Sequence, residues 1–276
     1  MSVATCCLSR SPTATVAEPV CLSVIAPCLN EEANVDLLVQ RTLAAFDALA
    51  TGAEIILVDD GSTDRTWERI QDCGRRDPRV RGVRHERNRG MEAGWQSGLA
   101  ASRGECVCLI DADLQNRPED IALLYNAYLR GWGDVIQAVR HAVASARHRC
   151  MFTRGLNWLL NSAFGMRSRD NKSGFILCRR EVLADILRHR GRYRYYQSFI
   201  GAAAHVRGYR IGEVDTVFDG RHGGQSFLSR PVRASLRILW ELAKFRVETW
   251  RERRPATEPD WLAAPGGVQV SAGERG

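Results

Sequence analysis

The stretch from Glu105 to Gln115 reads ECVCLIDADLQ, an unbroken apolar run that ends in two aspartates separated by one residue. The five apolar residues from Cys106 to Ile110 are typical of a strand buried on both faces of a sheet. Asp111 and Asp113 follow, where the strand gives way to a loop. The stretch therefore predicts a buried strand with a pair of carboxylates at its end, at one edge of a sheet.

The same pattern recurs along the chain, with apolar runs alternating with segments of helical periodicity. Strands are predicted at 22–27, 54–60, 81–86, 105–111, 134–140, 173–180 and 209–218, and helices at 31–49, after Ser62, at 91–102, 118–130 and 230–254. This alternation is typical of an α/β fold with a mostly parallel sheet covered by helices on both faces. Ligands of such sheets bind at the carboxyl ends of the strands, so residues 27–31, 59–62 and 111–113 are expected to meet at one edge.

Composition limits the class of protein further. The 276 residues are 45% hydrophobic and 26% charged, which is typical of a globular chain and excludes collagen-like or wholly disordered ones. The longest stretch without a charged side chain has 13 residues, 261–273, so no transmembrane helix is predicted. Only two of the 39 basic residues are lysines. The net charge of +7 and the arginine excess fit either an anionic partner or a GC-rich genome.

The ends of the chain differ in composition from its middle. Residues 1–19 contain neither the basic segment nor the apolar segment that a signal peptide has, and they are interpreted as a disordered tail. The Pro- and Gly-rich segment 255–276 is interpreted as a second disordered tail. Residues 20–228 are assigned to one α/β domain and 229–254 to a basic amphipathic helix. Nine cysteines without a CxxC pair favour the reducing cytoplasm.

Two pairs of carboxylates at strand ends are the candidate chemical groups. Asp111 and Asp113, with Gln115 as a third oxygen, form a candidate site for Mg²⁺ or Mn²⁺, although aspartates also cap turns. Asp59 and Asp60 follow another strand and are candidates for accepting hydrogen bonds from a nucleotide base or ribose. The alternative for that pair is a helix cap.

Several motifs in one order resemble those of the inverting GT-A glycosyltransferases, in the branch of dolichyl-phosphate mannose synthase and the polyprenyl-phosphate glycosyltransferases. They are PCLNEE at 27–32, VDDGSTD at 58–64, NRG at 88–90, DADLQ at 111–115 with Pro118 and Glu119, SGF at 173–175 and RREVL at 179–183. The similarity covers roughly residues 21–250. It implies the GT-A fold and transfer of a sugar from a nucleoside-diphosphate sugar such as GDP-mannose or a UDP-hexose.

The resemblance also implies roles for individual residues. Those that match the nucleotide-holding positions are Pro27, Leu29, Glu31 and Asp59, with Asp60 beside them. Asp111, Asp113 and Gln115 match the metal motif, and Asp113 and Arg221 are the expected catalytic residues. The segment FDGRHGGQS at 218–226, which contains Arg221, resembles a loop late in the family's sequence. Two residues depart from the family pattern: Leu29 replaces a frequent tyrosine, and Phe227 replaces the lysine that usually follows the serine at the end of this loop.

The acceptor is predicted to be a polyprenyl phosphate. Transfer to a hydroxyl needs a general base, but residues 193–198, where relatives that use hydroxyls carry an aspartate, contain no carboxylate. A phosphate monoester is already anionic and attacks without a base. Arg140, Arg149 and Thr153 match the family's acceptor-phosphate contacts. The alternatives are a soluble hydroxyl acceptor such as a secondary metabolite, and a non-catalytic nucleotide-sugar binder.

The predicted helix at 230–254 is apolar on two adjoining faces. One face carries Val232, Leu236, Leu239, Trp240, Ala243, Val247 and Trp250, and the other carries Ile238, Leu242 and Phe245. Residues 226–254 hold eight basic and three acidic side chains. This composition predicts contact with the cytoplasmic face of a membrane, the alternative being a helix packed on the domain or on a partner. No nucleic-acid-binding motif accompanies it, so no nucleic-acid partner is expected.

Overall fold

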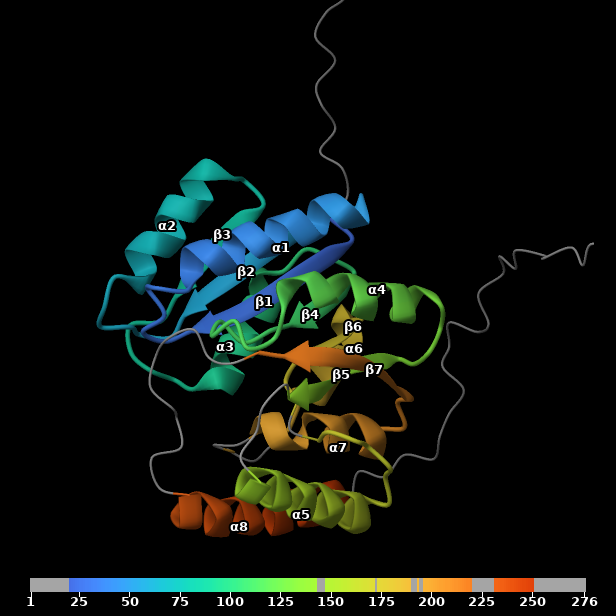
Figure 1. Cartoon of the computed structure of the whole chain (residues 1–276). Coiled ribbons are helices and arrows are strands. Elements are labelled where there is room, and N and C mark those ends of the chain that lie inside the picture. The colour runs from blue at the N-terminus through green and yellow to red at the C-terminus, as the bar shows by residue number, and fades with distance from the viewer. Residues whose placement is uncertain are drawn as a thin grey trace, which may run out of the picture.

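A computed structural model describes residues 20–142, 147–171, 173–189, 193, 196–219 and 231–250. Both predicted tails and Arg221 lie outside these residues. Figure 1 shows a central sheet with helices on both faces and a further pair of helices beyond one of them. Within the described residues, no helix is long and apolar enough to cross a membrane.

In the part of the chain that the structure describes, seven strands form one sheet in the order β3-β2-β1-β4-β6-β5-β7. The strands are β1 (Leu22–Cys28), β2 (Ala53–Asp59), β3 (Val80–Arg84), β4 (Cys106–Leu109), β5 (Val135–Ala142), β6 (Ile176–Arg179) and β7 (Ile211–Phe218). Only β6 runs antiparallel to its neighbours, β4 and β5. The prediction of a mostly parallel sheet is therefore confirmed, and the carboxyl ends of β1, β2 and β4 lie at the same edge.

The helices divide between the two faces. Helices α1 (Val35–Leu49), α2 (Thr66–Arg76) and α4 (Ile121–Leu129) cover one face, and α3 (Met91–Ala101), α6 (Arg180–Ile186) and α7 (Ile200–Val206) cover the other (Figure 1). Successive residues of a strand face opposite sides, so β1 sends Val24 into the core under α1 and Ile25 into the core under α3. The unbroken apolar runs follow from this burial on both faces.

Helices α5 (Arg147–Phe164) and α8 (Pro231–Trp250) pack together beyond α7 (Figure 1). Leu242 and Phe245, from the second apolar face predicted for the C-terminal helix, are buried against the domain. Phe245 lies among the rings of Phe164, Tyr193, Tyr196 and Phe199, with centroids 5.4 to 6.1 Å away. From the first face, Trp240 and Val247 stay 62% and 67% exposed. The two apolar faces thus have different surroundings.

This packing predicts the result of truncating Phe245. Phe245→Ala is expected to lower the free energy of unfolding by about 3 kcal/mol, because a fully buried ring is removed from a close-packed aromatic cluster. Val247→Ala, half a turn away and exposed, is expected to change it by less than about 0.5 kcal/mol. Urea denaturation of both variants measures the difference, and equal stabilities would contradict the docking of α8.

Candidate active site

The turn after β4 is buried at its centre and partly exposed at its two ends. Ala112, Asp113 and Leu114 are buried, Asp113 at 9% exposure, whereas Asp111 and Gln115 are partly exposed. Leu114 has a φ of +60°, a left-handed conformation that costs energy for a branched side chain and is common at functional sites. The Asp113 Oδ1 atom accepts a hydrogen bond of 3.2 Å from the Gln115 backbone N–H. The buried Leu114 anchors this turn, so the carboxylate pair has a fixed support.

A glutamine that the sequence analysis did not assign also reaches this pair. The Nε2 atom of Gln197, in the short helix η2 (Tyr196–Phe199), lies 3.4 Å from Oδ2 of Asp111. The Asn116 side-chain amide approaches the same oxygen at 3.4 Å. A Cβ at Gly174 would lie 2.4 Å from Gln197 Nε2, so any larger residue there would displace the Gln197 side chain. The predicted window 193–198 thus brings an amide to the aspartate pair.

The side chains at this turn fit a hard divalent cation. Asp111 and Asp113 would supply two carboxylates, and Gln115, whose Nε2 donates to the Asp219 carbonyl over 3.4 Å, would supply an amide oxygen. These are the ligand types that Mg²⁺ and Mn²⁺ take alongside substrate phosphates. Within the described residues no three His, Cys, Asp or Glu side chains gather closely enough to form a complete metal site. A cation held by two carboxylates and one amide oxygen would have coordination positions left for the phosphate oxygens of a ligand.

The loops after β1 and β2 are held together by side-chain hydrogen bonds. Asn30, with a φ of +56°, donates its backbone N–H to Ser62 Oγ over 3.0 Å and accepts the Thr63 N–H on Oδ1 over 2.9 Å. The Glu31 N–H donates to Thr66 Oγ1 over 2.8 Å. The predicted nucleotide residues at 27–31 and at 59–60 therefore lie at the ends of β1 and β2 and in the two loops that follow, which support each other.

The edge formed by these loops is rich in carboxylates. Burial raises the pKa of the Cys28 thiol at the end of β1, and the charges of Glu31, Asp59 and Asp64 raise it further. The Glu31 carboxylate accepts a hydrogen bond of 2.6 Å from Asn34 Nδ2. Pro27 and Leu29 are half-buried beside them. A diphosphate at this edge would need positive charge from a cation or from arginine.

The adjacent aspartates at 59 and 60 have different surroundings. Asp59 is fully buried, accepts the Ser62 N–H over 3.0 Å and has the Arg84 Nε 3.3 Å from Oδ2. Asp60 accepts the backbone N–H groups of Arg89 and Gly90, each over 2.8 Å, and lies 2.7 Å from His85 Nδ1. Asp60 therefore anchors the NRG segment, a role that the sequence analysis did not assign.

Of the three predicted acceptor contacts, the structure describes the side chain of Arg140. Arg140 forms a two-point ion pair with Asp170, through Nε to Oδ2 at 2.7 Å and Nη2 to Oδ1 at 2.9 Å. Burial opposes its charge, but Asp170 and the nearby carboxylates of Asp111 and Asp113 outweigh that effect and raise its pKa. Arg140 thus lies near the aspartate pair. Arg149 and Thr153 belong to α5, but their side chains lie outside the described residues.

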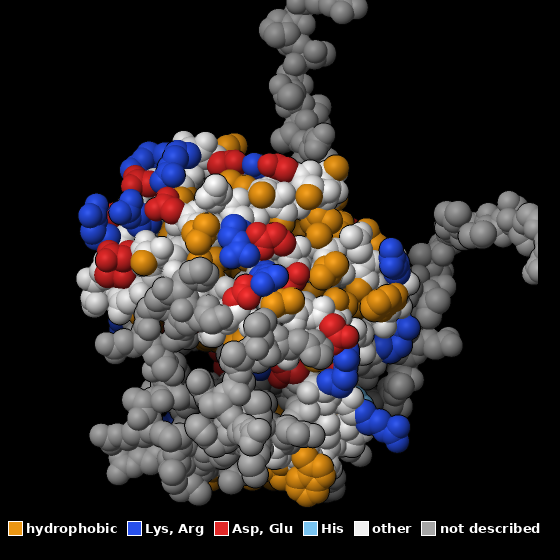
Figure 2. Space-filling model, viewed as in Figure 1, with side chains coloured by type: hydrophobic (Ala, Val, Ile, Leu, Met, Phe, Trp, Pro, Cys, Tyr) orange, Lys and Arg blue, Asp and Glu red, His pale blue; other side chains and the backbone are white. Residues whose placement is uncertain are grey.

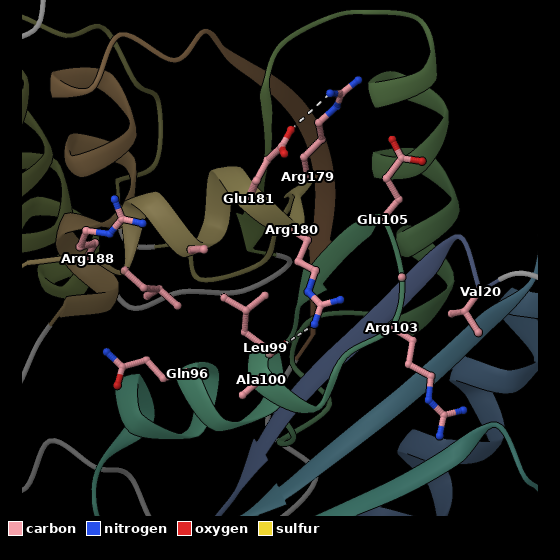
Figure 3. A pocket seen from close by; sticks show the side chains of 13 residues that line it. Val20, Gln96, Leu99, Ala100, Arg103, Glu105, Arg179, Arg180, Glu181 and Arg188 are labelled. Carbon is pink, nitrogen blue, oxygen red and sulfur yellow. Dashed lines mark hydrogen bonds and ion pairs between the residues drawn. The ribbon is translucent and has the colours of Figure 1, made fainter. Parts of the chain in front are cut away.

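Two open cavities among the described residues lie away from this edge. One, of about 970 Å³, lies between α3 and α6 (Figure 3). Arg103, Arg179, Arg180 and Arg188 line it, and each has a partner within the protein, such as Glu181 for Arg179 and Asp185 for Arg188. The other, of about 800 Å³, lies between the end of α5 and β7. Neither contains a predicted site residue.

Many of the arginines, which far outnumber the lysines, form ion pairs on the surface. Over α1 and α2, basic and acidic side chains alternate on the face shown in Figure 2. Ion pairs of residues in or next to these helices include Arg41 with Glu119, Arg76 with Asp36 and Arg79 with Asp47. Part of the arginine excess therefore pairs with acidic residues of the protein itself and is not evidence for an anionic partner.

The fold and the strand-edge site define a class of proteins, the GT-A glycosyltransferases. Glucosyl-3-phosphoglycerate synthase from Mycobacterium tuberculosis, solved with Mn²⁺, UDP and phosphoglyceric acid, aligns over 85% of this chain and 78% of its own, with a TM-score of 0.60 and 20% identity. Mannosyltransferase PcManGT from Pyrobaculum calidifontis, solved with GDP-Man and Mn²⁺, aligns over 85% of this chain and 67% of its own, with a TM-score of 0.60 and 18% identity.

The chain belongs to glycosyl transferase family 2, whose profile matches residues 23–187. A protein of Aeromonas hydrophila named undecaprenyl-phosphate 4-deoxy-4-formamido-L-arabinose transferase is 34% identical over 167 residues, which are 60% of this chain and 51% of that protein. The chain therefore spans about half the length of this relative. The family predicted from the sequence motifs is confirmed.

Proposed function

We propose that this protein is a metal-dependent, inverting glycosyltransferase that moves a sugar from a nucleoside-diphosphate sugar to a polyprenyl phosphate at a membrane surface. The observation that carries the proposal is the arrangement at one sheet edge: two tied loops after β1 and β2, the Asp111–Asp113 pair after β4, and Arg140 near that pair. These groups suit a donor diphosphate and an anionic acceptor in one place.

The donor is assigned to the loops after β1 and β2. Pro27, Leu29, Glu31 and Asp59 hold the nucleotide in this proposal, and Asp60 supports them by anchoring residues 89–90. Asp111, Asp113 and Gln115 would hold Mg²⁺ or Mn²⁺, and Arg221 would contact the diphosphate. When bound, the ion would stabilise negative charge on the departing diphosphate. GDP-mannose and UDP-hexoses are the donors to test, since structural neighbours were solved with GDP-Man or UDP.

The acceptor is assigned from the side chains near the aspartate pair. Gln197 offers an amide there, which cannot accept a proton as a general base at neutral pH. Arg140, with Arg149 and Thr153 from the start of α5, would bind the acceptor phosphate. The name of the Aeromonas relative, an undecaprenyl-phosphate transferase, supports this class of acceptor.

The proposed activity is tested with a panel of radiolabelled UDP-, GDP- and TDP-sugars. Each sugar is offered with Mn²⁺ and a short-chain polyprenyl phosphate in detergent, and the lipid-linked product is measured. Transfer to the lipid phosphate that stops when EDTA removes the metal is the expected result. Donor binding without turnover would favour a non-catalytic binder, and transfer only to soluble hydroxyl compounds would favour the other acceptor class.

Contact with the membrane is assigned to the α5–α8 layer. Trp158 on α5 is 69% exposed and Trp240 on α8 is 62% exposed. Lys244 Nζ lies 5.8 Å from the centre of the Trp240 ring. Exposed tryptophans with neighbouring cations are typical of elements that bind the headgroup region of a bilayer. The protein would then act as a peripheral protein on the cytoplasmic membrane face.

This assignment predicts vesicle binding that depends on particular tryptophans. Replacing Trp158 and Trp240 together by serine is expected to lower the partition coefficient on anionic vesicles by about tenfold or more, because two large apolar side chains no longer enter the interface. Trp132→Ser is the matched control, since Trp132 is 53% exposed but precedes β5 rather than lying on α5 or α8. Flotation measures both variants, and equal loss in both, or no binding by the unmodified protein, would contradict the assignment.

A further inference from the structure

Arg140 and Asp170 form an enclosed ion pair beside the candidate site. Asp170 accepts from two of the three guanidinium nitrogens, Nε and Nη2, in a parallel, two-point geometry. Its side chain is 10% exposed and that of Arg140 is 20% exposed. The ring of Phe218, 5.1 Å from the guanidinium carbon, covers the flat face of Arg140. Such a pair fixes the plane of the arginine and directs its remaining nitrogen, Nη1, away from Asp170.

Asparagines of α5 hold the chain on both sides of Asp170. Asn157 Nδ2 donates to the carbonyl oxygens of Ser168 and Arg169 over 2.9 and 3.1 Å. The Asn171 backbone N–H and side-chain amide both donate to Asn157 Oδ1 over 2.8 Å. Asn161 adds a bond of 2.9 Å from Nδ2 to the Ser168 carbonyl. The loop that carries Asp170 is therefore fixed to a helix rather than free to turn away.

Asp170 is also held from the side of the sheet. The neighbouring Arg169 pairs with Glu213 at 2.7 Å and with Asp215 at 2.8 Å, both on β7. A carboxylate held from two elements has few alternative positions. The carboxylates of Asp111 and Asp113 also attract the charge of Arg140, so without Asp170 its guanidinium would be drawn toward them.

We propose that Asp170 is a positioning residue that holds Arg140 in the orientation needed to bind the acceptor phosphate, and that Asn157, Asn161 and Asn171 form its support. This inference rests on the proposed function, in which Arg140 contacts the acceptor. Asp170 directs the guanidinium away from the metal-binding aspartates and presents Nη1 to the acceptor. It acts through Arg140 and does not itself touch the acceptor.

The test separates acceptor binding from donor binding. Asp170→Asn keeps the shape of the side chain but removes the charge that orients Arg140. The acceptor KM for a short-chain polyprenyl phosphate is expected to rise by about tenfold or more, while the donor KM stays within about twofold. Arg167→Gln is the matched control, because it removes an exposed positive charge from the same loop without touching the ion pairs described above, and its acceptor KM is expected to stay within about twofold.

A double-mutant cycle tests whether Asp170 acts through Arg140. If it does, Asp170→Asn adds less than about twofold to the acceptor KM of an Arg140→Lys protein. Should Asp170→Asn not fold, Asn157→Ala weakens the same support, and its acceptor KM is expected to rise while its donor KM does not. A lowered acceptor KM in Asp170→Asn would show that Asp170 competes with the acceptor for Arg140. An unchanged acceptor KM would show that Asp170 has no role in binding the acceptor. Either result overturns this inference and leaves the proposed function in place. An unmodified protein inactive toward every polyprenyl phosphate rejects the proposed function as well.

Discussion

Replacement of Asp113 by alanine is expected to lower sugar transfer by about a thousandfold or more, with the fold intact. Asp113 is one of two carboxylates at the turn after β4, and a single carboxylate cannot replace the pair as ligands for a divalent cation. Loss of the charge that stabilises a leaving diphosphate costs several kcal/mol of transition-state stabilisation, and each 1.4 kcal/mol is about tenfold in rate. Initial rates at saturating Mn²⁺, alongside thermal unfolding, measure this effect.

The control for this variant lies in the next turn. Glu119→Ala removes an exposed carboxylate that pairs with Arg41 at 2.6 Å and is expected to keep the transfer rate within about twofold. Near-normal turnover of the Asp113 variant, with the metal concentration controlled, would exclude the proposed role of the aspartate pair. A large loss of thermal stability in that variant would show that Asp113 mainly supports the fold.

Asp60→Ala is expected to have the largest effect on stability, lowering the free energy of unfolding by about 3 to 4 kcal/mol. The Asp60 carboxylate is 4% exposed and receives the Arg89 and Gly90 N–H groups as well as His85. Hydrogen bonds to a charged group contribute about 1.5 to 3 kcal/mol each, and their removal leaves partly buried donors without an acceptor. Urea denaturation measures the change in unfolding free energy.

The exposed Asp72, which pairs with Arg75 three residues along α2, provides the comparison. Asp72→Ala is expected to change the unfolding free energy by less than about 0.5 kcal/mol, as for other exposed ion pairs. A loss of less than about 1 kcal/mol in Asp60→Ala would mean that other contacts hold residues 89–90 in place. The role of Asp60 would then have to be sought in ligand binding.

The strands could be predicted from the sequence because a strand buried on both faces consists of consecutive apolar residues. Cys106 to Leu109 and Ala53 to Val58 face helices on both sides, so every position is apolar except Glu54, whose carboxylate accepts from Ser23 and pairs with Arg81. The position of the aspartate pair followed from the strand that precedes it. Local patterns of this kind need no knowledge of distant parts of the chain.

The partners of the site residues could not be predicted in the same way. Gln197 meets Asp111 across 86 positions, and Asp170 meets Arg140 across 30. Nothing in the sequence near Arg140 indicates which carboxylate will pair with it. Gly174 was a usable signal, because a glycine within a buried motif indicates a close approach, here by Gln197. For the C-terminal helix, periodicity gave two apolar faces but not which of them would be buried.

The proposed activity depends on paired acids at this sheet edge that hold a divalent cation together with the donor diphosphate. Anomalous diffraction from a crystal grown with Mn²⁺ and a non-transferable nucleotide sugar tests this arrangement. We expect a manganese peak in contact with both Asp111 and Asp113 and beside the diphosphate, with the nucleotide lying on the loops after β1 and β2. A nucleotide bound elsewhere in the protein, or one bound at this edge without manganese beside these aspartates, would contradict it.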